Sequence, residues 1–368
     1  MLKFKIVFVN IIIFFLLLFF IEGIAWVVLK LLTEKKAPLH QRLVYYQQQT
    51  WAEEYVMEHQ KSFRFDFQPF VMSRKKTYKG NYVNIDSSSL RYTAYNSPKV
   101  GAKKVFFMGG STIYGTGSPD SLTIPSYFTK ILHQKNKDTA IVSSNFGESA
   151  WVVQQSFIQL VGELRKGNIP DYVILYDGAN DMYAALQNQR ANSIQNAMTY
   201  SQNIHPTYKS VLQRIWLMGK EKSYTLALVQ HFIGETKFAT LTPAQEQALA
   251  QDVIANYLGT YQLIAALAKS YGFEFVMFWQ PTIQTTNKKL GEQEKIILKN
   301  QDKVLTSFIK TTNKTIEKVS NEQYPNLHLL HNALDSISVD VFFDFVHITP
   351  QGNEVIAQKM IDILVTKQ

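Results

Sequence analysis

The feature that most constrains this chain is a repeated alternation of short apolar runs with longer helix-like segments, from Lys103 to the C-terminus. The runs are rich in β-branched and aromatic residues and bounded by turn residues, which is typical of strands. Such alternation favours an α/β fold with a parallel sheet that helices cover on both faces. The predicted strands are 105–108, 140–145, 172–176, 273–279 and 327–331. The predicted helices are 124–134, 152–166, 244–270, 293–318 and 351–366.

One section breaks the alternation. Residues 183–241 are aromatic-rich and polar, and we interpret them as an insertion that covers or flanks the sheet edge. In parallel sheets, ligands collect where the carboxyl ends of the strands meet. We therefore expect the insertion to shape the pocket and with it the choice of substrate.

The N-terminus is apolar over residues 6–21 except for Asn10, and again over 23–32 except for Lys30. A continuous helix here reaches the roughly 20 residues that cross a bilayer. A cleaved signal peptide has a shorter apolar core followed by small residues. We therefore predict an uncleaved transmembrane signal anchor, with Glu22 either near the interface or against a partner helix.

The composition predicts three parts: the anchor at 1–34, a polar and aromatic stalk with a lead-in at 35–101, and a catalytic domain at 102–368. Basic residues flank the anchor on both sides, so charge does not orient it. The formal net charge is +9, but the basic residues are scattered and form no stripe with aromatic residues. Nucleic-acid binding is therefore disfavoured, whereas attraction to anionic lipid or an acidic glycan stays open.

The chain has no cysteine, which excludes disulfides, thiolate catalysis and cysteine-based metal sites. The eight histidines form no His-x-His or His-Glu-x-x-His motif, so a catalytic metal is disfavoured as well. We expect no cofactor.

The stretch VFFMGGSTIYGTG, residues 105–117, ends a predicted strand with glycines and Ser111. A phosphate-binding loop needs a lysine that this stretch lacks, and Asp120 replaces the third glycine of a dinucleotide fingerprint. Ile113 replaces the last glycine of the Gly-x-Ser-x-Gly elbow. An accessible serine at a strand end remains, and by itself a turn with a helix cap is the preferred interpretation.

Other predicted strand ends supply the groups that a reactive serine needs. Catalysis by serine requires a base, a group that orients the base, and donors for the oxyanion. Asp344 precedes His347 by three residues, so both can lie in one short turn before the last helix. Gly147 follows the second strand and Asn180 the third, where a backbone N–H and a side-chain amide are candidate donors.

These four blocks resemble the SGNH (GDSL-type) hydrolase superfamily, in particular membrane-anchored members with a Gly-Gly-Ser-Thr first block. The resemblance covers about residue 84 to the C-terminus. Two places depart from the family pattern. Gly110 stands where the name-giving motif has aspartate, and Ser149-Ala150-Trp151 occupies a place after Gly147 that often holds a further glycine.

The resemblance implies a three-layer α/β/α fold of flavodoxin-like type and a site without metal. Ser111 would be the nucleophile, His347 the base and Asp344 its orienting carboxylate. The oxyanion hole would consist of the Ser111 and Gly147 N–H groups and the Asn180 amide.

The resulting hypothesis is a membrane-anchored serine esterase for O-acyl, in particular O-acetyl, esters of a cell-envelope glycan. The family implies a single-pass protein of a bacterial inner membrane, with its domain in the periplasm or outside the cell. Two alternatives stay open. One is an O-acyltransferase that works with a membrane-bound O-acyltransferase partner, and the other is a non-enzymatic envelope scaffold.

Overall fold

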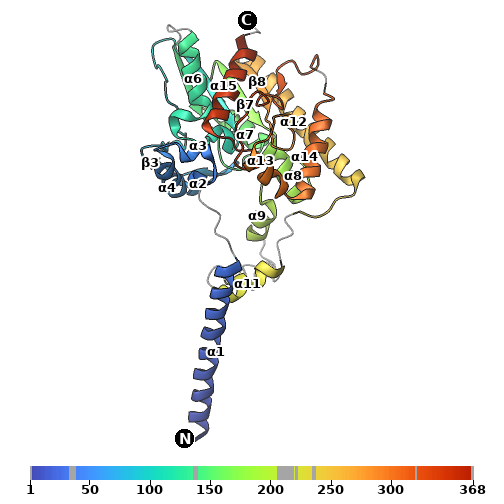
Figure 1. Cartoon of the computed structure of the whole chain (residues 1–368). Coiled ribbons are helices and arrows are strands. Elements are labelled where there is room, and N and C mark those ends of the chain that lie inside the picture. The colour runs from blue at the N-terminus through green and yellow to red at the C-terminus, as the bar shows by residue number, and fades with distance from the viewer. Residues whose placement is uncertain are drawn as a thin grey trace. The chain divides into compact units, whose positions relative to one another are not determined.

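The computed structural model describes residues 2–32, 39–135, 140–204, 219, 223–233, 238–319 and 321–365. Its contacts divide the chain into two compact units (Figure 1). The first contains the N-terminal helix and residues from 197–237, and the second contains the rest. Parts of the predicted anchor end and of the predicted insertion, at 33–38, 205–218, 220–222 and 234–237, lie outside the described residues.

The first unit contains α1 (Leu2–Leu32), α9 (Ala197–Ile204) and α11 (Tyr224–Ile233). Within α1, the 27 residues Ile6–Leu32 are long and apolar enough to cross a membrane. The Glu22 carboxylate accepts hydrogen bonds from the Ser223 hydroxyl, from the Tyr224 N–H and from Thr225. Glu22 thus satisfies free N–H groups at the start of α11, so this acidic side chain contacts a helix of its own chain.

The second unit is built on a five-stranded parallel sheet in the order β6-β5-β7-β8-β9. The five predicted strands are confirmed, with ends shifted by at most a few residues. The chain moves from β5 outwards to β6 and then returns to β7 on the other side of β5. Ligands bind at such a switch point in open α/β sheets. The strands are β5 (Lys103–Gly109), β6 (Ile141–Asn145), β7 (Tyr172–Asp177), β8 (Glu274–Trp279) and β9 (Leu327–Leu329).

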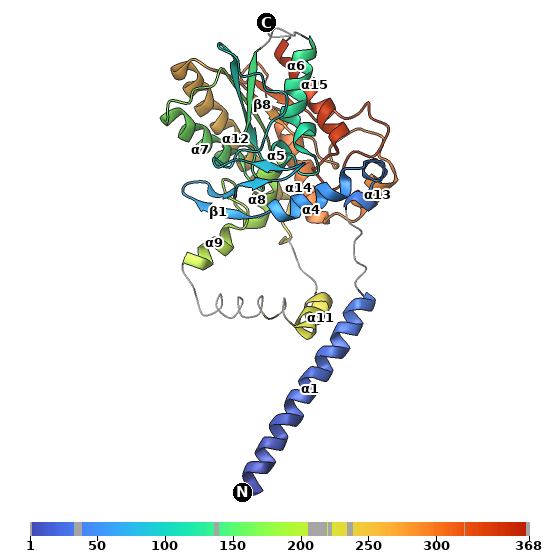
Figure 2. The same cartoon turned by 90° about the vertical axis from the view of Figure 1, so that its left-hand side faces the viewer.

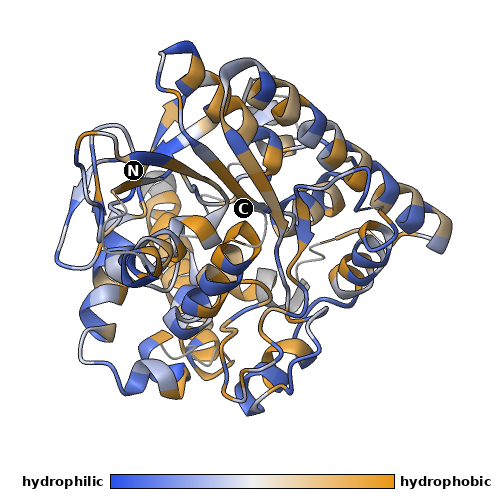
Figure 3. Cartoon of the chain, turned by 90° about the horizontal axis from the view of Figure 1, so that it is seen from above, coloured by the Kyte–Doolittle hydropathy of each residue, from blue (hydrophilic) through white to orange (hydrophobic). Residues whose placement is uncertain are grey.

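Alternate strand residues face two helix layers, which gives the α/β/α fold (Figures 2 and 3). Phe106 and Met108 pack on one side, while Val105 and Phe107 pack on the other. The first side is covered by α7 (Val153–Arg165), α8 (Ala179–Asn188), α12 (Pro243–Tyr271) and α14 (Lys303–Ile316). The second is covered by α6 (Ile124–Lys135) and α15 (Pro350–Val365).

One predicted helix is wrong in extent. The segment 293–318 forms α13 (Glu292–Lys299) and α14 rather than one helix. Asp302 explains the break, because its carboxylate accepts the N–H groups of Val304 and Leu305 and so starts a new helix.

From Leu39 onward, the segment predicted as a stalk and lead-in packs within the second unit. Its buried Tyr46 packs with Phe343, and its buried Tyr55 packs with Tyr114. The segment consists of α2 (Leu39–Arg42), α3 (Val44–Gln47), α4 (Ala52–Ser62), β1 (Phe65–Gln68), β2 (Met72–Lys75), β3 (Tyr78–Lys79) and β4 (Asn84–Ile85).

Candidate active site

Ser111 is the first residue of a short helix, α5 (Ser111–Tyr114), which begins directly after β5, and its side chain is half-buried. Gly110, the residue before it, lies close to Asn180 and Trp151. A Cβ at Gly110 would lie 2.3 Å from Asn180 Nδ2 and 3.3 Å from the Trp151 carbonyl oxygen. A side chain at position 110 would therefore displace the Asn180 amide in this chain.

Asp344 and His347 lie in the loop between β9 and α15 and form a hydrogen-bonded chain with Ser111. His347 Nε2 lies 2.7 Å from Ser111 Oγ, and its Nδ1 lies 2.6 Å from Asp344 Oδ2. The other carboxylate oxygen of Asp344 accepts the N–H groups of Val346 and His347 at 2.9 and 2.7 Å. One carboxylate therefore holds both the imidazole and the turn that carries it.

The charge state of Asp344 suits an orienting role. Burial raises the pKa of its carboxyl, but the neighbouring His347 and the hydrogen bonds from His347 and Val346 outweigh burial and lower it below the ordinary value. The group is therefore a carboxylate at neutral pH. With a proton on Nδ1 held by this carboxylate, Nε2 is free to accept the Ser111 hydroxyl proton.

Asn180 lies in the first turn of α8, and both ends of its amide have a partner. Its Nδ2 donates to the Trp151 carbonyl oxygen at 2.8 Å, and its Oδ1 accepts from Gln195 Nε2 at 3.0 Å. An amide nitrogen carries two hydrogens, so one N–H remains for a ligand. Gln195 gave no signal in the sequence, because it is one polar residue in a polar stretch.

Gly147 lies against α5, but its N–H is already used. It donates to Asn145 Oδ1 at 3.0 Å, and Asn145 Nδ2 donates to the Ile113 carbonyl oxygen at 2.9 Å. A Cβ at Gly147 would lie 2.3 Å from Tyr114 N. The structure thus gives this glycine a spatial reason, while the predicted third oxyanion donor has an acceptor within the protein.

Two buried carboxyl groups, at the end of β7 and in the first turn of α8, bond to residues of α7. Asp177 Oδ2 accepts a hydrogen bond from the Ser156 hydroxyl at 3.3 Å. Asp181 accepts the N–H groups of Val153 and Gly178 at 3.1 and 3.2 Å. Burial raises the pKa of both groups, to about 6 for Asp181 and well above the ordinary value for Asp177.

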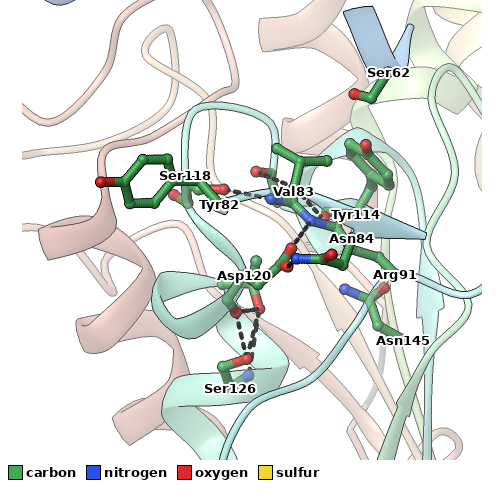
Figure 4. Close-up of polar contacts among 12 residues, drawn as sticks. Ser62, Tyr82, Val83, Asn84, Arg91, Tyr114, Ser118, Asp120, Ser126 and Asn145 are labelled. Atoms are coloured by element: carbon green, nitrogen blue, oxygen red, sulfur yellow. Dashed lines mark hydrogen bonds and ion pairs between the residues drawn. The ribbon is translucent and has the colours of Figure 1, made fainter. Parts of the chain in front are cut away.

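A buried arginine from the lead-in holds the loop that follows α5 (Figure 4). The Arg91 guanidinium donates to three carbonyl oxygens at 2.6–2.9 Å and pairs with Asp120 Oδ1 at 2.9 Å. Its side chain is 0% exposed, so these acceptors replace water completely. The acceptors are the carbonyls of Tyr114, Gly115 and Ser118.

A second buried ion pair, between Lys288 and Glu294, holds the start of the loop that carries His347. Lys288 Nζ lies 2.6 Å from Glu294 Oε2, and both side chains are 0% exposed. The other oxygen of Glu294 accepts the N–H groups of Val341 and Phe342 at 2.8 and 3.0 Å. Sequence patterns did not indicate Arg91 or Glu294, because their partners are distant in the chain.

The sequence also matches a known protein family. Residues 105–360 match the model of the GDSL-like lipase/acylhydrolase family. No curated protein matches the chain.

Solved structures resemble the chain only weakly. LAE5, an alpha/beta hydrolase enzyme from the metagenome of Lake Arreo in Spain, is 13% identical over 73% of this chain and 96% of its own, with a TM-score of 0.39. Axe2, an acetylxylan esterase from Geobacillus stearothermophilus, is 13% identical over 73% of this chain and 95% of its own, with a TM-score of 0.38. The family model covers more than half of the chain, and the assignment depends on it. The chain therefore belongs to the GDSL-like lipase/acylhydrolase family, and it is a hydrolase of ester bonds.

Proposed function

We propose that this chain is a membrane-anchored serine esterase that removes O-acetyl groups from a cell-envelope glycan through an acyl-serine intermediate. The observation that carries the proposal is the chain of hydrogen bonds from Ser111 Oγ through His347 to Asp344, with distances of 2.7 and 2.6 Å. A nucleophile, a base and an orienting carboxylate are the parts that acyl transfer requires. The apolar helix α1 and the Gly-Gly-Ser-Thr block support the anchor and the envelope substrate.

In the first half of the reaction, Ser111 Oγ bonds to the ester carbonyl carbon while its proton passes to His347 Nε2. The carbonyl oxygen becomes an oxyanion, and the Ser111 N–H and the free N–H of Asn180 are placed to stabilise it. His347 then gives its proton to the leaving sugar oxygen, and the acyl group stays on Ser111. The Gly147 N–H would take part as a third donor only after it leaves Asn145.

In the second half, water attacks the acyl-serine while His347 accepts a proton from the water. The proton returns to Ser111 Oγ as the ester bond breaks, and the carboxylic acid leaves. A sugar hydroxyl in place of water would give an O-acyltransferase with the same residues. That alternative needs an acyl donor from a membrane partner. Glu22, the acidic residue within the apolar helix, bonds to α11 of its own chain.

The test uses the full-length chain in detergent micelles with p-nitrophenyl acetate, with and without an oligosaccharide acceptor. We expect hydrolysis to fall by at least about 10³-fold in Ser111→Ala and His347→Ala. Ser121→Ala is the matched control, since Ser121 is also half-buried and lies at the surface of the same domain, in the 3-10 helix Asp120–Leu122. Turnover that survives Ser111→Ala rejects the proposal. Acyl transfer to the sugar that outpaces hydrolysis assigns the acyltransferase, and a folded but inactive parent assigns the scaffold.

A further inference from the structure

A line of contacts runs from the lead-in segment to the imidazole of His347. The Phe343 ring stacks beside the imidazole of His347. The two ring planes differ by 10°, and the two ring centroids are 5.6 Å apart. The Phe343 N–H also donates to the His347 carbonyl oxygen at 3.1 Å. Phe343 is buried, with 8% of its surface exposed, so its position is fixed by whatever packs around it.

Two lead-in and loop residues pack around Phe343. A Cβ on Gly117 would lie 2.5 Å from Phe343 Cε1, which places the Gly117 backbone directly against the ring. The Tyr46 ring meets Phe343 edge-on, with centroids 6.2 Å apart and planes at 75°. Edge-on aromatic pairs of this kind hold a defined geometry beyond simple burial.

Gly117 is held at both of its polar groups by tyrosines of the lead-in. The Tyr46 hydroxyl donates to the Gly117 carbonyl oxygen at 2.7 Å, and the Gly117 N–H donates to the Tyr55 hydroxyl oxygen at 2.8 Å. Each tyrosine is only 1% exposed. Gly117 also lies in the loop that follows α5, so the same two side chains brace this loop and the surface on which Phe343 rests.

We propose that Tyr46 is a positioning residue that sets the orientation of the His347 imidazole through Gly117 and Phe343. The inference rests on the proposed function, in which His347 is the base. Asp344 fixes Nδ1 of the imidazole, but one hydrogen bond still allows the ring to tilt. The Phe343 ring limits that tilt, and a misplacement of about 1 Å at a reacting group can cost about 10²-fold in rate. Through Tyr46, the lead-in then contributes to the geometry of the active site.

The experiment measures kcat and KM for p-nitrophenyl acetate with the full-length chain in detergent. We expect Phe343→Leu to lower kcat by about 10–100-fold with KM within about twofold. Tyr46→Phe, which removes one hydroxyl and keeps the ring, should lower kcat by about 2–10-fold. Tyr45→Phe is the matched control on the same helix, because no hydrogen bond of its hydroxyl occurs among the described residues, and it should match the parent.

A double variant separates positioning from general destabilisation. If Tyr46 acts through Phe343, Tyr46→Phe combined with Phe343→Leu should have the same kcat as Phe343→Leu alone. Losses that multiply, or losses seen only in KM, reject the inference. Should Phe343→Leu fail to fold, a Tyr46→Phe variant with an unchanged melting temperature and unchanged kcat rejects it equally. In all these cases an inactive Ser111→Ala leaves the proposed function standing.

Discussion

Gln195 donates from Nε2 to Asn180 Oδ1 over 3.0 Å, and this contact determines which way the Asn180 amide presents its N–H groups. We expect Gln195→Leu to lower kcat by about 3–10-fold, which corresponds to the loss of roughly one hydrogen bond. Asn180→Ala should lower kcat by about 10²–10³-fold, because it removes a proposed oxyanion donor. Steady-state kinetics with p-nitrophenyl acetate gives both values.

Gln187 provides the control for this prediction. It lies on the same helix as Asn180, but its side chain bonds to Asn196 on the exposed surface. Gln187→Leu should therefore keep the parent kcat. A Gln195→Leu variant as active as the parent, beside an impaired Asn180→Ala, would show that the amide needs no support from Gln195.

Arg91 should be among the most sensitive positions for stability. Arg91→Met leaves the Asp120 carboxylate and three backbone carbonyls without their donor in a buried site. We expect the free energy of unfolding to fall by about 3–5 kcal/mol, the usual result of breaking a buried ion pair. Urea unfolding followed by tryptophan fluorescence measures it. Arg64→Met, at an exposed position, should change it by less than about 0.5 kcal/mol.

His59 should make the fold sensitive to acid. Burial, helped by the charges of Arg91 and Lys75, lowers the pKa of its imidazole to about 3. An unfolded histidine has a pKa of about 6.5, so between these values the unfolded chain binds a proton that the folded chain does not. The free energy of unfolding therefore falls as pH falls through this window, by up to about 1.4 kcal/mol per pH unit.

His59→Phe should remove this contribution. The ring lies among Tyr55, Phe63 and Tyr114, so phenylalanine suits the site. Melting temperatures of the parent and the variant, measured from pH 7 to pH 5, should diverge as the pH falls. Two curves that stay parallel over this range would contradict the assignment.

Asp177 should tolerate the loss of its charge but not of its polar atoms. Burial and the neighbouring Asp181 raise its pKa well above the ordinary value, so a neutral side chain suits the site at pH 7. Asp177→Asn should therefore change the free energy of unfolding by less than about 1 kcal/mol. Asp177→Ala leaves the buried Ser156 hydroxyl without its acceptor and should cost about 1–3 kcal/mol. Equal losses in the two variants, measured by urea unfolding, would show that Asp177 is charged.

The sequence was informative where the relevant relationship is local. Strands appear as short apolar runs, and the Asp344–His347 pair is separated by three residues, so both could be predicted from spacing alone. Gln195, Arg91 and Glu294 act on partners 15 to 48 residues away, where no spacing rule applies. Gly147 lies between these cases. The pattern identified this glycine as a backbone donor, but not its bond to Asn145 or its close packing against Tyr114.

Gly147 can be tested for its need of space separately from its hydrogen bond to Asn145. Gly147→Ala keeps the backbone N–H but places a Cβ 2.3 Å from Tyr114 N. We expect it to lower the free energy of unfolding by about 1–3 kcal/mol through overpacking. It should also lower kcat by at least about tenfold, because the helix that begins at Ser111 must shift.

Ala150→Gly is the counterpart in the same loop. Ala150 has a φ of 64°, which costs an alanine about 1–2 kcal/mol and a glycine almost nothing. The greater backbone entropy of glycine in the unfolded chain cancels part of this gain, so the variant should be more stable by up to about 1 kcal/mol, with kcat unchanged. Parent stability and parent kcat in Gly147→Ala would contradict the packing role of this glycine. Loss of both would establish that the glycine is required for close packing against α5.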